Sequence, residues 1–387
     1  MSPNLPRRQE RRGLRLWPVG IVLALAFVTA IAIAAGVFFA GWDLLGAQGL
    51  KPQRQLTSQT LFDLVKLSFG VVAGAGALVA LIVAYRRQRV DEDGALRDAT
   101  RLHTERFTTA VSQLGEESAA VRLGGVHALA GLADDAPTRD LRQTCIDVLC
   151  AYLRLPYTYV PEVDPPSDDV SARHAYMAMR EVRHTTIRLI RDHLRLPPEH
   201  PHSWRGHDLD FTGAVFDGGD FSGAVFSGGT VSFTGAVFSR GGTVRFADVV
   251  FSGGTVDFFG TDISGTVDFS GAVFSGAKVT FSGSVLSGGT IRFSRAHFSG
   301  GTVRFDRVLF TDGTADFKLT QFSGGTVDFD LASFSGGTVR FDLASFFGGT
   351  VRFSNVIGGE PSGLVPQDGQ PLPTGLDLPP GWYRPTS

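Results

Sequence analysis

Hydrophobic and polar residues alternate with a regular period over residues 209–353. Phenylalanines recur every 12 residues, and a second apolar series falls five residues after each member of the first. In Thr350-Val351-Arg352-Phe353, alternation places Val351 and Phe353 on the inner face of a short strand. Ser-Gly-Gly and Ser-Gly-Ala follow as bends, because glycine tolerates a positive φ. The pattern predicts stacked coils that share one aromatic core.

The period leaves two coil lengths, 12 or 24 residues, and the outward residue before each phenylalanine of the first series distinguishes them. A 12-residue coil would stack Arg292 on Arg304, with like charges at the strand spacing of about 4.8 Å. A 24-residue coil never places like charges together. We therefore predict four faces and about 24 residues per turn, in about six turns. The predicted outward ladder is Arg245, Asp268, Arg292, Asp316 and Arg340, and the predicted core is Phe211, Phe216, Phe221, Phe226, Phe269, Phe281, Phe293, Phe305, Phe317, Phe329, Phe341 and Phe353.

The repeated units resemble the pentapeptide repeat family, in which a small residue lies two positions before a central Leu or Phe. Ala214 and Ala224 have this spacing to Phe216 and Phe226. From Phe226 onward the chain departs from the strict pattern by two extra residues per pair of units. The resemblance implies a right-handed quadrilateral β-helix with phenylalanines stacked inside, and it implies no single activity.

Two uncharged stretches precede the repeats, at residues 19–41 and 67–85. Each is long enough to cross a bilayer as an α-helix. Positive charge is concentrated before the first stretch and directly after the second, at Arg86, Arg87 and Arg89, so the positive-inside rule favours cytoplasmic termini. We expect a multi-pass protein of a bacterial inner membrane with the lipid bilayer as a partner, rather than a secreted protein with a cleaved signal peptide.

Small residues lie four apart in the second predicted span, at Gly70 and Gly74. This spacing lets helix backbones approach closely, either within a two-span hairpin or between two copies of the chain. The sequence does not choose between these arrangements, so a homo-oligomer formed through the transmembrane helices stays an alternative.

An open β-helix exposes its core at both ends, so other segments are expected to cover it. The helical region through Trp204 is predicted to cap the first coil. Leu376, Leu378 and Trp382 of the tail either cover the last coil or stay disordered. The predicted segments are a basic cytoplasmic tail (1–18), transmembrane helices (19–41 and 67–85) with an external loop (42–66), a cytoplasmic helical region (86–205), the β-helix (206–357) and a Pro-rich tail (358–387).

The last predicted helix before the repeats has a basic face, formed by Arg180, His184, Arg188, Arg191 and Arg195. Such a face contacts anionic lipid or nucleic acid, or it is simply solvated. Residues 86–207 hold 17 basic and 18 acidic residues, and this balance favours a solvated face.

No motif for catalysis, a cofactor or a metal is present. Cys145 and Cys150 are five apart on a predicted helix, a spacing that does not bring both onto one face. Four histidines near the start of the repeats lack a committed carboxylate or thiolate partner. We therefore expect no cofactor, no metal and no enzymatic activity. These histidines are His193, His200, His202 and His207.

Two function classes remain after catalysis is set aside. Some pentapeptide repeat proteins mimic DNA and modulate topoisomerases, a role that needs a strongly acidic rod. Residues 206–360 hold 15 acidic and 10 basic residues, with the arginines interleaved. A DNA-mimicking topoisomerase modulator is therefore only the alternative, and nucleic acid is not expected as a partner. The expected function is a membrane-anchored, non-catalytic interaction or scaffold module that presents a rigid β-helix to an unknown protein partner in the cytoplasm.

Overall fold

The computed structural model describes residues 57–157, 170–365 and 371–383, and isolated residues between 24 and 43 that are helical where described. The chain divides into two compact units, residues 1–98 and 99–387, and each is described by itself. The predicted basic tail, and most of the predicted first span at residues 19–41, lie outside the described residues.

The first unit contains most of helix α2 (Ser58–Gly115). From Leu61 onward, α2 is the one helix within the described residues that is long and apolar enough to cross a membrane. The predicted second span therefore lies inside a longer helix, because hydropathy marks the apolar window but not the helix ends. A Cβ added at Gly70 or Gly74 would meet no atom within 4 Å. No described segment packs on this face of α2.

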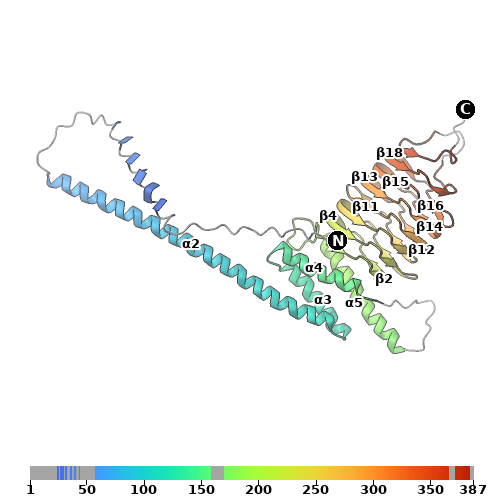
Figure 1. The fold of residues 1–387 in the computed structure, drawn as a ribbon, viewed down its shortest axis with the longest axis horizontal. Coiled ribbons are helices and arrows are strands. Elements are labelled where there is room, and N and C mark those ends of the chain that lie inside the picture. Colours follow the sequence, from blue (N-terminus) through green and yellow to red (C-terminus); the bar gives the residue numbers. More distant parts are fainter. Residues whose placement is uncertain are drawn as a thin grey trace, which may run out of the picture. The chain divides into compact units, whose positions relative to one another are not determined.

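The second unit begins with a helical cap, made of the end of α2 with α3 (Ala119–Asp134), α4 (Arg139–Arg154) and α5 (Val170–Arg195). Gly125 of α3 lies directly on α2, where a Cβ would come within 2.7 Å of the Leu114 amide nitrogen. Leu129, Ile146 and Ile190 are buried between the helices. Figure 1 shows α4 and α5 against the end of the solenoid that bears β2.

The rest of this unit is a β-solenoid whose strand pairs are all parallel and form two sheets. One sheet contains β1 (Leu209–Asp210), β4 (Val225–Ser232), β7 (Val250–Asp257), β10 (Val273–Phe274), β11 (Lys278–Thr280), β13 (His297–Arg304), β15 (Gln321–Asp328), β18 (Ser345–Arg352) and β20 (Leu376–Asp377). The other contains β2 (Val215–Phe216), β3 (Gly219–Asp220), β5 (Val237–Phe238), β6 (Thr243–Arg245), β8 (Asp262–Ile263), β9 (Thr266–Asp268), β12 (Val285–Arg292), β14 (Leu309–Asp316), β16 (Ser333–Phe334), β17 (Thr338–Arg340) and β19 (Ile357–Gly358).

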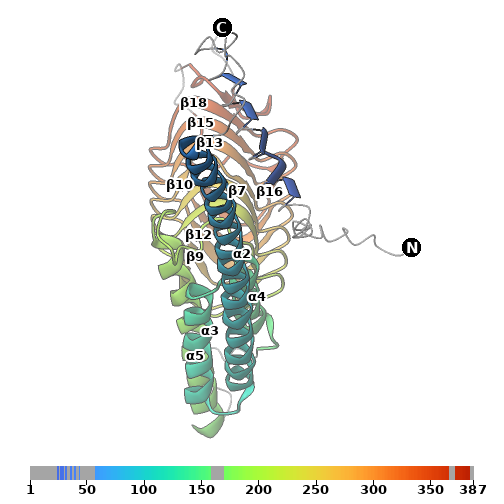
Figure 2. The ribbon, with the colours of Figure 1, turned by 90° about the vertical axis from the view of Figure 1, so that its left-hand side faces the viewer.

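The strand register confirms the predicted coil length of about 24 residues. Val279 pairs with Val303, Val303 with Val327, and Val327 with Val351. The stack has about seven turns, one more than predicted. The prediction counted only the regular repeats over residues 209–353, whereas β20 of the tail adds a further strand beside Val351. Figure 2 shows the coils stacked from β7 to β18.

The core is a set of aromatic columns in which each phenylalanine stacks on its counterpart one turn away. Phe281 and Phe305 have ring centroids 4.9 Å apart and nearly parallel planes, and Phe305 meets Phe317 edge to face at 5.7 Å. Both geometries are favourable for aromatic pairs. All twelve predicted core phenylalanines are at most 2% exposed.

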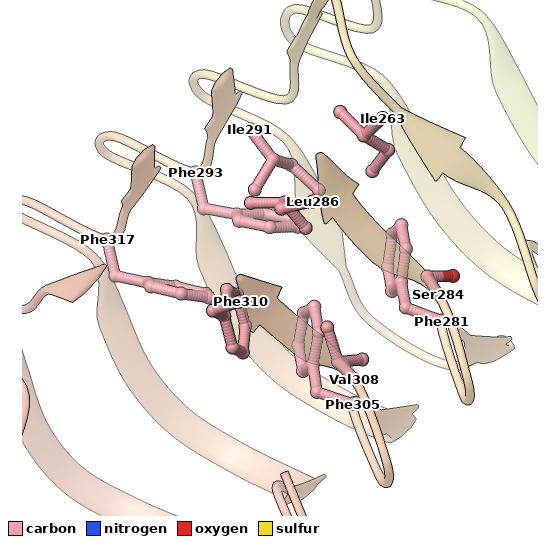
Figure 3. A pocket seen from close by; sticks show the side chains of 10 residues that line it. All are labelled: Ile263, Phe281, Ser284, Leu286, Ile291, Phe293, Phe305, Val308, Phe310 and Phe317. Atoms are coloured by element: carbon pink, nitrogen blue, oxygen red, sulfur yellow. The ribbon is translucent and has the colours of Figure 1, made fainter. Parts of the chain in front are cut away.

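One column changes from phenylalanine to smaller aliphatic residues, at Ile263 and Leu286. A cavity of about 10 Å³ lies beside them, between Phe293 and Phe310. Figure 3 shows that the side chains lining this cavity all point into the solenoid interior. Its volume is about that of one water-sized probe. The cavity is therefore a minor packing defect and too small to be a ligand site.

Candidate interaction surface

The outward charges before the core phenylalanines form a ladder along the second sheet. Arg245 pairs in register with Asp268, and Asp268 with Arg292. Arg292 then pairs with Asp316, and Asp316 with Arg340. At the last step, an Arg340 guanidinium nitrogen lies 3.8 Å from Asp316 Oδ2. Because arginine and aspartate alternate, this face carries no continuous band of either charge.

The ladder aspartates also stabilise the corners of the coil. Asp268 Oδ1 accepts a hydrogen bond from the Ser270 amide at 3.0 Å, and Asp316 Oδ1 accepts one from the Lys318 amide at 2.9 Å. Aspartate commonly bonds the backbone two residues ahead in this way at turns. Their presence is therefore explained by local structure, without any ligand.

Each corner after a core phenylalanine requires a backbone with positive φ. In the early coils this position is mostly glycine, such as Gly223 and Gly271. From Phe293 onward every such corner holds another residue, including Arg295, Leu319 and Leu343 below Gly223 and Gly271, and the φ of both leucines is 60°. A left-handed conformation costs about 1–2 kcal/mol for a residue other than glycine. The later corners therefore carry a backbone strain that the early glycines avoid.

These strained leucines are exposed. Leu319 and Leu343 are 37% and 71% exposed, and Phe347, four residues after Leu343 in the chain, is 62% exposed. Phe347 stands where the two preceding coils of this column have Ser299 and Ser323. We call Leu319, Leu343 and Phe347 the apolar corner. Sequence reasoning missed it, although leucine at a glycine position and phenylalanine at a serine position were visible signals.

Four of the five residues of the predicted basic face of α5 contact the first coil, and the fifth, Arg188, is exposed and bonds Thr185 of the same helix. Arg191 forms a salt bridge with Asp220, and Arg195 Nε donates to the Ser222 carbonyl at 2.8 Å. Arg180 and His184 lie 3.3 and 3.2 Å from the carboxylate oxygens of Asp217. The face therefore attaches the helical cap to the solenoid.

Asp217 is the centre of this junction and is almost fully buried. Tyr157 and Tyr176 each donate a 2.6 Å hydrogen bond to its Oδ2. Burial alone would raise the pKa of Asp217, but the hydrogen bonds from His184, Tyr157 and Tyr176 outweigh burial and lower it well below its usual range. The carboxylate is thus held charged as a structural anchor.

Arg183 is a second anchor that the sequence did not indicate. It is 3% exposed, and its Nη2 donates to the carbonyls of Leu153 at 2.9 Å and Val215 at 2.7 Å. Its guanidinium also lies over the Tyr157 ring, 4.2 Å from the centroid. These contacts join α4, α5 and the first coil through one side chain.

Two of the junction histidines, His193 and His202, share the carboxylate of Asp134, and His207 contacts an amide. His193 Nε2 lies 3.1 Å from Asp134 Oδ2, and His207 Nδ1 donates to Gln143 Oε1 at 2.9 Å. No group of three or more His, Cys, Asp or Glu within the described residues is arranged to hold a metal. The two cysteines are free and buried. Burial raises the pKa of the Cys145 and Cys150 thiols to about 11 and 12, so both stay protonated at neutral pH.

The C-terminal tail covers the other end of the solenoid. Leu376 pairs with Val351 and is buried. The Trp382 ring lies against Phe353 and Phe334, with centroids 5.7 and 6.0 Å apart. The chain therefore covers both solenoid ends itself, and its lateral faces and corners stay accessible.

The architecture defines the class as a β-solenoid of two parallel sheets with about 24 residues per turn and a phenylalanine core. Residues 211–262 and 258–309 match the family described as pentapeptide repeats (9 copies). The repeat segment therefore matches the pentapeptide repeat family and forms a β-solenoid. A comparison with curated proteins found no match. Solenoids of this family are generally non-catalytic structural or interaction modules.

Proposed function

We propose that this solenoid is a non-catalytic protein-interaction module and that the apolar corner is its contact surface. The observation that carries the proposal is the pair Leu319 and Leu343, which are both exposed and held at positive φ. Backbone strain of this kind persists where the structure or a function requires it. Glycine at the same corner of earlier coils shows that folding does not require leucine there.

The energetics favour a partner over a folding role. Each leucine costs about 1–2 kcal/mol in backbone conformation relative to glycine. Leu343, at 71% exposed, recovers little of that cost, since only apolar area removed from water stabilises the fold, by about 25 cal/mol per Å². A docked protein would bury Leu343 and Phe347, and an aromatic anchor is typical of the residues that dominate binding energy.

The charged ladders supply selectivity in this proposal. Alternating arginine and aspartate on a neighbouring face would admit a partner with complementary alternation and repel one with a uniform charge. The same alternation argues against the DNA-mimic alternative. A mimic of the phosphate backbone needs a continuous acidic face, whereas Arg245, Arg292 and Arg340 interrupt the ladder at every second turn.

We further propose that the chain is anchored in a bacterial inner membrane by two spans, with both termini in the cytoplasm. The long apolar helix α2 and the arginines after residue 85 support this proposal. Single cysteines placed in the two terminal segments test it, because the native thiols are buried. Both engineered cysteines should react with a membrane-impermeant maleimide only after the membrane is opened. Labelling of either one in intact cells would contradict the topology.

The interaction proposal is tested by returning the apolar corner to the residues of earlier coils. The variant combines Leu319→Gly, Leu343→Gly and Phe347→Ser. Crosslinked purification from membranes should recover proteins with the native chain that the variant loses, while the variant's melting temperature is unchanged or higher. Phe259→Ser is the matched control, since Phe259 is another exposed aromatic, at 53%, in an earlier coil. Equal recovery by native chain and variant would disprove the role of the apolar corner.

A further inference from the structure

A concave site in the helical cap is distinct from the proposed interaction surface. It has a volume of about 320 Å³ and lies between the α3–α4 loop and the segment that follows α5. Arg139, Arg142 and Arg205 line it, with His200 and His207, and no carboxylate does. Two acids lie near it: Asp134 directs its carboxylate to His193 and His202, and the charge of Asp208 acts on His207. We call this site the arginine cavity.

The three guanidinium groups are fixed in place by neutral partners. Arg142 donates to the carbonyls of Ala133 and Asp134, at 2.7 and 3.2 Å. Arg205 donates to those of Leu194 and Arg195, at 3.0 and 2.9 Å.

Arg139 likewise donates to the Gly206 carbonyl, and none of the three arginines forms a salt bridge within the described residues. Carbonyl dipoles hold each side chain but do not neutralise its charge. Since a guanidinium has five N–H donors, each arginine keeps donors for a further acceptor.

Two other features bear on the electrostatics of the cavity. The N-terminus of the 16-residue helix α4 opens beside it, with Thr138 as N-cap and part of the lining. Burial is the main cause that lowers the pKa of His207 to about 4, and the charges of Arg139 and Arg142 add to it while that of Asp208 opposes them. The imidazole is thus kept neutral mainly by burial, and the two arginines act in the same direction.

We propose that the arginine cavity binds the phosphate group of a small anionic ligand. Guanidinium forks match phosphate oxygens in charge and geometry, and three guanidinium-bearing side chains line this site. Because backbone carbonyls already hold each of them, binding costs less conformational freedom than it would for arginines without such contacts. The shared chemistry is a phosphate group, which either a soluble phosphomonoester or the phosphodiester of a lipid headgroup supplies.

The test uses the purified full-length chain and two probes at low ionic strength. Glycerol 3-phosphate represents a monoester, and glycerophosphoglycerol represents the headgroup of phosphatidylglycerol. Calorimetry should show binding that weakens as salt rises. In chains with isotope-labelled histidine, the pKa of His207 should rise on binding. Tighter monoester binding identifies a soluble ligand, and equal or tighter diester binding identifies a headgroup. Absence of binding by both probes at roughly 10 mM overturns the proposal.

Variants separate binding from folding. Arg139→Gln should weaken binding about ten-fold or more, since a charge-assisted hydrogen bond contributes about 1.5–3 kcal/mol. Arg142→Lys keeps the charge but loses the fork, and should weaken binding less than Arg142→Gln does. Arg195→Gln is the control, because Arg195 binds the first coil outside the cavity. Unchanged melting temperatures and equal affinity of all variants would show that any bound probe lies elsewhere, and would also overturn the proposal.

Discussion

Trp382 lies across the last turn of the solenoid, with its ring centroid 5.7 Å from that of Phe353. The contact joins a proline-rich tail to the end of an aromatic column that would otherwise face water. The solenoid thus ends on a side chain from outside the repeats.

Trp382→Ala should expose Phe353 and Phe334 and loosen the final turn. Because Trp382 is half-buried, we expect a loss of about 1–3 kcal/mol in unfolding free energy, below the range for fully buried tryptophan. Hydrogen exchange should accelerate in β18 and β19 and stay unchanged in β4. Uniform acceleration through all coils would mean that the tail stabilises the whole solenoid rather than its end.

Asp217 should make the junction between cap and solenoid sensitive to acid. Its pKa is lowered in the folded chain, whereas it is about 3.9 in the unfolded chain. Its contribution is therefore complete above about pH 4 and is lost as pH falls toward the folded pKa. Asp217→Asn should cost roughly 2–4 kcal/mol at neutral pH and reduce this acid dependence, as measured by denaturant unfolding between about pH 2 and 7. Identical acid profiles would contradict the assignment.

The stability that His193 contributes should change with pH in the opposite direction. Burial lowers its pKa, but Asp134 and the Leu189 carbonyl accept from its two nitrogens and raise the pKa overall. Its contribution is present below about pH 6.5 and is lost as pH rises through the folded pKa. Its ring stacks on Trp204 at 4.1 Å, so Trp204 fluorescence should rise on deprotonation. The His193→Gln variant should lack this rise in fluorescence. A rise that persists in the variant would show that a group other than His193 causes it.

Substitutions at the corners of the coil should separate the free-energy cost of a positive φ from the contribution of side-chain packing. Gly235 has φ of 63° and open space where a Cβ would lie, so Gly235→Ala should lower the unfolding free energy by about 1 kcal/mol through conformation alone. Leu343→Gly should leave it unchanged or raise it by up to about 1 kcal/mol. Chemical denaturation of the two variants checks both. A marked destabilisation by Leu343→Gly would show that Leu343 serves folding.

The small core cavity should have little effect on stability. At about 24 cal/mol per Å³, a volume of about 10 Å³ corresponds to only about 0.2 kcal/mol. Leu286→Phe should therefore change the unfolding free energy by less than about 1.5 kcal/mol, since equivalent positions accept phenylalanine. Leu286→Ala should cost about 2–5 kcal/mol. The same denaturation assay measures both variants. A larger loss of unfolding free energy for Leu286→Phe than for Leu286→Ala would mean that this column of the core cannot accept another aromatic ring.

The coil length could be predicted because the information is local and repeated. Charge repulsion between Arg292 and Arg304 rules out the shorter coil without knowledge of the fold. The early coils were harder, since Leu209 pairs with Val231 and Val231 with Val256, and these unequal steps lack the later spacing. The length of α2 also escaped prediction, because helix continues through polar residues on both sides of its apolar window.

The candidate site was less predictable than the fold. The arginines of α5 were visible, but their binding to Asp217 and Asp220 depends on how the cap docks, and helical periodicity does not specify docking. The leucine at position 343 can likewise be seen in the sequence, whereas its positive φ follows from the geometry of the corner. The cavity formed by Arg139, Arg142 and Arg205 joins segments more than 60 residues apart in the chain, and no spacing rule connects them.

The solenoid has two different periods, one geometric and one electrostatic. The backbone repeats after every turn, but the charges repeat only after two, as from Arg292 to Arg340 or from Arg304 to Arg352. Duplicating one turn would therefore set arginine on arginine, whereas duplicating two would keep every neighbour opposite in sign. A gene that lengthens this solenoid without electrostatic conflict must add turns in pairs, so its alternation limits the lengths that evolution can readily reach.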